Sequence, residues 1–191
     1  MVEITLSISL AKAGLRLLGT VDAADPLIPP TLATFASSCS SEDGAFGEVV
    51  DLDDPRVQEK ANSEWYRLAL RGGLFGEVGS QFLVAVKRAG SDSPQWWWAR
   101  VELLDEWDIV GAGASSGILG SGPCRPSFVM LSLDGGVILR CDVGQASIDF
   151  SVVREPHHAQ TLRQHGEWMA ESPRVDEFTR AAIRNWLGNR R

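Results

Sequence analysis

Residues that can act as a nucleophile or a base occur in the second half of the chain. Cys124 lies in the segment GSGPCRPS, where Arg125 would favour the reactive thiolate. Ser115 occupies the centre of a Gly-x-Ser-x-Gly pattern, which is typical of hydrolase nucleophiles. His157 and His158 follow and could act as the base. No further motif joins these residues, so we assign no catalytic residue and keep the four as candidates for a hydrolase or a transferase.

The stretch DIVGAGASSGILGSGP, which contains Ser115, also matches two nucleotide-binding fingerprints. Residues Ala112–Leu119 resemble the nucleotide loop of the short-chain dehydrogenases, and a glycine pattern in the same stretch resembles the general dinucleotide fingerprint. Such a loop must open a helix that binds the phosphates, and Pro123 and Pro126 prevent that helix. We therefore predict a flexible connection between a strand that ends at Val110 and the next strand.

The histidines and carboxylates lack the spacing of metal ligands. His158 and His165 are seven residues apart, about 10 Å along a helix. The acidic run that begins at Glu42 lacks the spacing of a calcium-binding loop, so we predict no metal and no cofactor. A concentrated negative charge speeds association with a basic protein. The candidate binding residues of this run are Glu42, Asp43, Asp51, Asp53 and Asp54.

Three consecutive tryptophans provide the other candidate site. If QWWWARVEL is a strand, Trp97 faces the core, and Trp96, Trp98 and Arg100 share the opposite face. Two indoles beside a guanidinium suit stacking on a planar ligand or a protein interface. The alternative is that a helix covers these indoles, so the sequence leaves open whether this face is a binding site.

Composition excludes several classes of protein. The 191 residues carry a net charge of −7, which argues against a protein that binds nucleic acid by neutralising phosphates. No apolar run approaches the roughly 20 residues needed to cross a membrane. The three cysteines are few and odd in number, which argues against a disulfide scaffold. No signal peptide is recognisable. We expect a cytoplasmic protein that binds neither nucleic acid nor membranes.

The periodicity of apolar residues predicts the elements that would position these sites. Apolar residues alternate along VEITLSISL, which predicts a strand, and five further runs between residues 81 and 154 predict an antiparallel meander. We expect an α+β fold in which helices, including a C-terminal one, pack on one face of this sheet. The expected single domain over 1–191 comprises a strand with an irregular acidic and proline-rich region (1–54), a helix (55–71), the sheet (81–154) and a helical C-terminal segment (156–188).

Together these features favour a non-enzymatic domain that binds another protein with a basic surface. An inhibitor, an immunity-type protein or an accessory subunit would have this character. Two alternatives remain. One is a small-molecule binding module that uses the face of Trp96, Trp98 and Arg100, and the other is a hydrolase or transferase with Cys124 or Ser115 as nucleophile.

Overall fold

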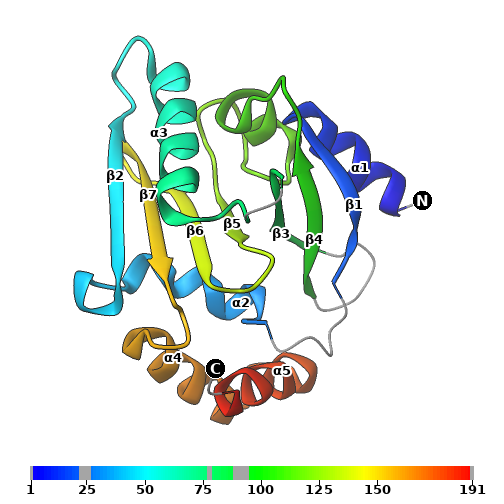
Figure 1. The fold of residues 1–191 in the computed structure, drawn as a ribbon, viewed down its shortest axis with the longest axis vertical. Coiled ribbons are helices and arrows are strands. Elements are labelled where there is room, and N and C mark those ends of the chain that lie inside the picture. The colour runs from blue at the N-terminus through cyan, green and yellow to red at the C-terminus, as the bar shows by residue number, and fades with distance from the viewer. Residues whose placement is uncertain (1, 22–26, 77–78, 88–94, 190–191) are drawn as a thin grey trace.

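The computed structural model describes residues 2–21, 27–76, 79–87 and 95–189 (Figure 1). Its centre is a sheet of seven antiparallel strands in the order β1-β4-β3-β5-β6-β7-β2. The strands are β1 (Leu15–Thr20), β2 (Ala45–Asp51), β3 (Gln81–Lys87), β4 (Trp96–Leu103), β5 (Phe128–Leu131), β6 (Val137–Val143) and β7 (Ser147–Arg154).

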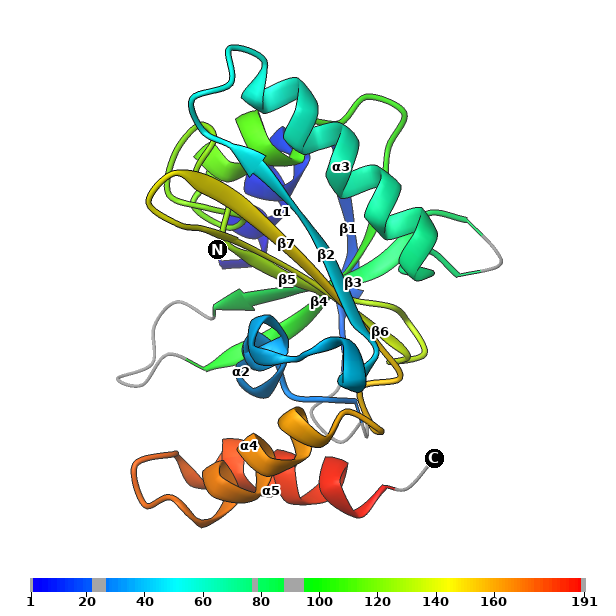
Figure 2. The same cartoon turned by 90° about the vertical axis from the view of Figure 1, so that its left-hand side faces the viewer.

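Helices cover both faces of this sheet. Helices α1 and α3 pack on one face, and α2, α4 and α5 pack on the other (Figure 2). The helices are α1 (Val2–Lys12), α2 (Pro30–Ala33), α3 (Val57–Gly72), α4 (Gln160–Glu171) and α5 (Glu177–Gly188), with short turns η1 (Thr34–Ser38), η2 (Ser41–Asp43), η3 (Ile109–Gly113) and η4 (Ala114–Ser116).

The predicted α+β class, the antiparallel sheet and the C-terminal helix are confirmed, and the structure adds the second helical layer. The reason is visible in β3, where both sets of alternating side chains are buried. Phe82 and Val84 belong to the core under α1 and α3, whereas Leu83 and Ala85 belong to the core under α4 and α5. A strand that is apolar on both sides needs cover on both sides.

The N-terminal segment is helix α1, and the prediction of a strand there is wrong. An alternation of period two also places apolar residues four positions apart, as a helix requires. Leu10 is fully buried and Leu6 packs against the same core, whereas Ile8 is exposed. Gly14 then adopts a positive φ of 75°, and the chain continues into the edge strand β1.

The sheet also departs from a simple meander. Strand β3 pairs with β4 on one side and with β5 on the other, so β4 and β5 are not neighbours. The free side of β4 pairs with β1, and β2 pairs with β7 at the opposite edge. The long connection after β4 makes this return possible, and it carries the glycine-rich stretch.

Candidate functional site

The glycine-rich stretch, residues 108–123, packs against the core under α1 and α3 and is not a flexible connection. We call it the cap. Residues Ile109–Gly113 form a π-helical turn, so the prediction of a strand that ends at Val110 is wrong. Ile109, Val110 and Leu119 are fully buried in the core under α1 and α3. Apolar side chains at three positions therefore hold the stretch in place, and the glycines allow close approach of the backbone.

One carboxylate organises this cap. Asp108 accepts hydrogen bonds from the backbone N–H groups of Gly111 and Ala112, both at 2.8 Å. It also accepts one from Asn62 Nδ2 at 2.7 Å and one from Gln58 Nε2 at 3.0 Å, and both amides come from α3. Burial tends to raise the pKa of Asp108, but these hydrogen bonds outweigh it and lower the pKa below its ordinary value.

Ser115 does not occupy a hydrolase-type elbow. It lies in the 3-10 turn η4, which follows the π-helical turn rather than a strand. Its Oγ donates a hydrogen bond to the carbonyl oxygen of Gly111 at 2.8 Å. A nucleophile elbow needs a strand, a sharp turn and a helix, so the local structure lacks the geometry of that motif.

The Cys124 thiol has a raised pKa, contrary to the effect expected of Arg125. Burial and the negative charge of Asp108 both raise it. The backbone N–H of Cys124 donates to the carbonyl oxygen of Val110 at 3.2 Å, which places this residue beside the cap. A raised pKa reduces the thiolate fraction at neutral pH and with it the nucleophilicity of the sulfur.

The histidines lie on the other face of the sheet. His157 stacks on Trp186 of α5 with ring centroids 5.2 Å apart, and burial, His158 and Arg163 lower its pKa. His158 is exposed and contacts Glu155, at 3.2 Å between Nδ1 and Oε2. Because Val110 belongs to the core of the α1 and α3 face and Trp186 to the opposite core, the sheet separates these histidines from Cys124.

No group of three or more histidine, cysteine or acidic side chains within the described ranges is arranged to hold a metal ion. None of the helices in the same ranges is both long and apolar enough to cross a membrane.

The acidic run is divided between the two ends of β2. At one end, Asp43 accepts a hydrogen bond from the Thr161 hydroxyl at 2.6 Å and joins η2 to α4. At the other end, Asp54 pairs with Lys60, and Asp51 accepts from the backbone N–H of Asp53 at 2.9 Å. Seven residues of strand span about 20 Å, so the predicted carboxylates do not form one patch.

Of the predicted face of Trp96, Trp98 and Arg100, only Trp98 is covered. Trp98 is 5% exposed, and its indole N–H donates to the carbonyl oxygen of Ile28 at 2.8 Å. Arg100 is exposed and donates to the side chain of Gln81. The three tryptophans instead border a hollow of about 520 Å³, part of it open to solvent, between the start of β4 and α5. We call it the tryptophan groove, and its lining is Val21, Leu27, Pro29, Pro30, Thr31, Trp96, Trp97, Trp98, Phe178, Thr179 and Ala182.

A second candidate site, which the sequence did not reveal, lies on α3. Tyr66 stacks on Trp107 with ring centroids 5.4 Å apart and contacts Phe75 at 5.9 Å. Tyr66 is 38% exposed and Leu70, one helical turn further along, is 55% exposed. Trp107 and Phe75 are half-buried against Trp65. We call Tyr66, Leu70, Phe75 and Trp107 the α3–Trp107 surface.

Negative charge lies beside Trp107 and at the start of α3. Residues 51–62 and 104–112 contain seven carboxylates and two basic side chains, so five of the chain's seven excess negative charges lie in these segments. The amides of α3 that bind Asp108 hold the two segments together. Asp105 and Glu106 are exposed, directly before Trp107. A sequence signal did exist, because DEWD places a tryptophan among three carboxylates.

Comparisons with protein-family models, with curated proteins and with solved structures found no match to this chain.

Proposed function

We propose that the protein is a non-enzymatic interaction domain that binds another protein with a basic surface. The observation that supports this proposal is the position of the α3–Trp107 surface next to the main concentration of negative charge. Tyrosine and tryptophan supply much of the binding energy at protein interfaces. Carboxylates beside them, such as Asp105 and Glu106, steer a basic partner and disfavour an acidic one. An inhibitor, an immunity-type protein or an accessory subunit would use such a surface.

The surface is well suited to binding because it is already rigid. Trp107 directly precedes Asp108, which caps η3 and is held by four hydrogen bonds. The buried ring of Trp65 supports Trp107 from below, with centroids 5.1 Å apart. A surface that does not need to be ordered on association loses less conformational entropy when it binds.

We place the protein in a reducing compartment, with the cytoplasm as the proposed location. Cys39, Cys124 and Cys141 are all free thiols, and Cys141 is buried inside the core. Structural disulfides are rare in such compartments.

The test is a comparative capture from lysate of the native host, with quantification of each bound protein. The baits are the wild type, the double variant Tyr66→Ala/Leu70→Ser, and Trp168→Ser as a matched control. Trp168 is 62% exposed on α4, on the opposite face of the sheet, so its loss removes an exposed aromatic side chain elsewhere. We expect a basic partner that binds the wild type and Trp168→Ser and is lost from the double variant.

Salt provides the second readout of the same experiment. The captured complex should associate more slowly as ionic strength rises, because screening weakens attraction between opposite charges. A partner that binds the double variant as well as the wild type would contradict the proposal. Failure of the wild type to retain any partner would contradict it as well.

A further inference from the structure

We propose that the tryptophan groove is a binding site for a small, flat, uncharged aromatic molecule. This inference is independent of the protein-binding proposal, because the groove and the α3–Trp107 surface share no residue and most of the groove lies on the opposite face of the sheet. Trp98 and α5 belong to the core of the α4 and α5 face, whereas α3 covers the other face (Figure 2).

The chemistry of the lining selects the ligand. Its side chains comprise three tryptophans, one phenylalanine, two prolines, three aliphatic residues and two threonines, and none of them is charged. A charged group buried against this lining would lose its hydration, and none of the lining residues offers it an ion-pair partner. Aromatic rings bind other flat rings by stacking and edge contacts, and threonine hydroxyls can donate or accept a hydrogen bond.

The floor of the groove is fixed in position. The indole of Trp98 is buried and tied to the backbone of Ile28, as described above. The ring of Trp96 lies under the ammonium group of Lys87, with 4.9 Å from Nζ to the ring centroid. Both indoles are therefore held before any ligand arrives, which reduces the entropic cost of binding.

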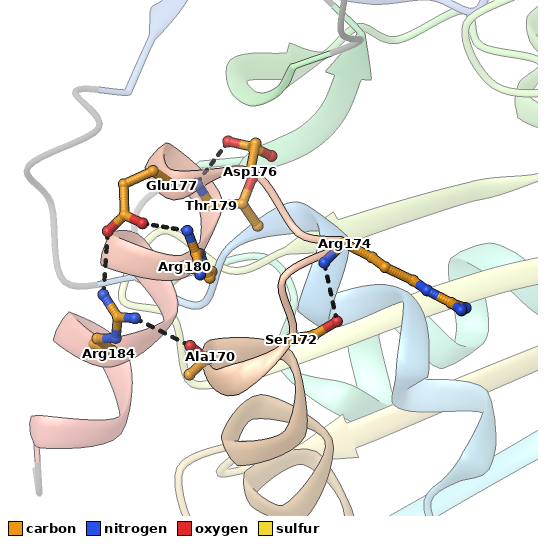
Figure 3. A network of polar contacts seen from close by, with 8 residues as sticks. All are labelled: Ala170, Ser172, Arg174, Asp176, Glu177, Thr179, Arg180 and Arg184. Atoms are coloured by element: carbon orange, nitrogen blue, oxygen red, sulfur yellow. Dashed lines mark hydrogen bonds and ion pairs between the residues drawn. The ribbon is translucent and has the colours of Figure 1, made fainter.

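The wall formed by α5 is fixed by polar contacts (Figure 3). Asp176 caps the helix by accepting from the backbone N–H of Thr179 at 2.9 Å. Glu177 pairs with Arg180 and Arg184, and Arg184 reaches across to the carbonyl oxygen of Ala170 at 3.1 Å. The contact of Arg184 joins α5 to the end of α4, and the contacts of Asp176 and Glu177 fix the turns of α5 that face the groove.

Helix α5 leaves the ring of Phe178 partly exposed to solvent at the groove. Phe178 is 40% exposed, although its ring centroid is only 5.8 Å from that of Trp97. Trp96 and Trp97 are also only half-buried at this mouth. Exposed rings on two sides of a fixed hollow leave apolar surface that a flat ligand would remove from water.

The experiment is a binding titration of the full chain with indole and with 1-naphthol, followed by saturation-transfer NMR of the ligand. The blocking variant is Ala182→Phe, which places a ring inside the groove from α5. The matched control is Trp168→Ala, which removes a tryptophan of the same helical hairpin outside the groove. Thermal unfolding checks that each variant is folded.

We expect at least one of the two probes to bind the wild type and Trp168→Ala equally, and Ala182→Phe at least about tenfold more weakly. If Ala182→Phe does not fold, Phe178→Ala replaces it, since truncating a partly exposed ring is structurally mild and should also weaken binding. Absence of binding by both probes up to about 1 mM would overturn the proposal. Equal binding to wild type and to the folded groove variant would overturn it too.

Discussion

Asp108 joins the cap to α3 through one carboxylate, so its replacement should lower the stability of the protein. Asp108→Ala leaves the N–H groups of Gly111 and Ala112 and two side-chain amides without their acceptor. We expect the free energy of unfolding to fall by about 2 kcal/mol. Urea denaturation measures this, with the exposed neighbour Asp105→Ala as a control that should change it by less than about 0.5 kcal/mol.

His157 predicts a pH dependence of stability at the same scale. Its pKa is lowered in the folded protein by burial and by the positive neighbours His158 and Arg163, so the folded state binds this proton less readily than the unfolded state. Stability should be full above the unfolded pKa of about 6.5 and decline as pH falls through it. Urea denaturation from pH 7.5 to 5.5 should show this decline in the wild type. His157→Gln should reduce this loss of stability more than His158→Gln does. The same loss in His157→Gln as in the wild type would contradict the assignment of the pH dependence to His157.

At the scale of elements, the cap depends on close approach of its backbone. A Cβ atom at Gly120 would collide with the carbonyl oxygen of Arg125 and lie 2.9 Å from Cβ of Ala114, whereas one at Gly122 would meet nothing within 4 Å. Gly120→Ala should therefore lower the free energy of unfolding by about 2 kcal/mol or more, and Gly122→Ala should leave it nearly unchanged. Equal thermal stability of the two variants would show that the cap is looser than described.

The sequence predicts the elements that follow a simple rule. Helix α3 has buried residues at helical spacing, Ala61, Trp65 and Leu68, and it occupies the range expected for a helix. The edge strand β2 was missed because Gly47 and Glu48 interrupt its apolar pattern. Helix α1 was mistaken for a strand because its alternation satisfies both periods, and only packing of the folded chain decides between them.

The candidate sites were less predictable because they combine distant segments. Tyr66 and Trp107 meet where Asp108 binds the amides of α3, and no local pattern reports a contact across 41 residues. The strand that carries Trp96 and Trp98 was predictable, but the segments that pack over these tryptophans were not. Ile28 and Phe178, which border Trp98 and Trp97, come from segments about 70 and 80 residues away.

At the scale of the whole molecule, the two candidate sites differ in charge and lie apart. The α3–Trp107 surface carries partly exposed rings beside an acidic region, and the tryptophan groove, most of which lies on the other side, has an uncharged lining. A basic protein and a neutral small molecule would therefore bind at separate places. We expect indole or 1-naphthol to leave the affinity for the protein partner unchanged in a competition experiment. Displacement of one ligand by the other would show that the sites are coupled.

The most direct test of the central claim is photo-crosslinking in cells of the native host. A photoreactive phenylalanine analogue is placed at Tyr66 in one variant and at Trp168 in another, since both side chains are exposed aromatics. We predict that the probe at position 66 crosslinks to one basic protein and that the probe at position 168 does not. Absence of a specific crosslink at position 66, or the same crosslinked protein from both positions, would contradict the account.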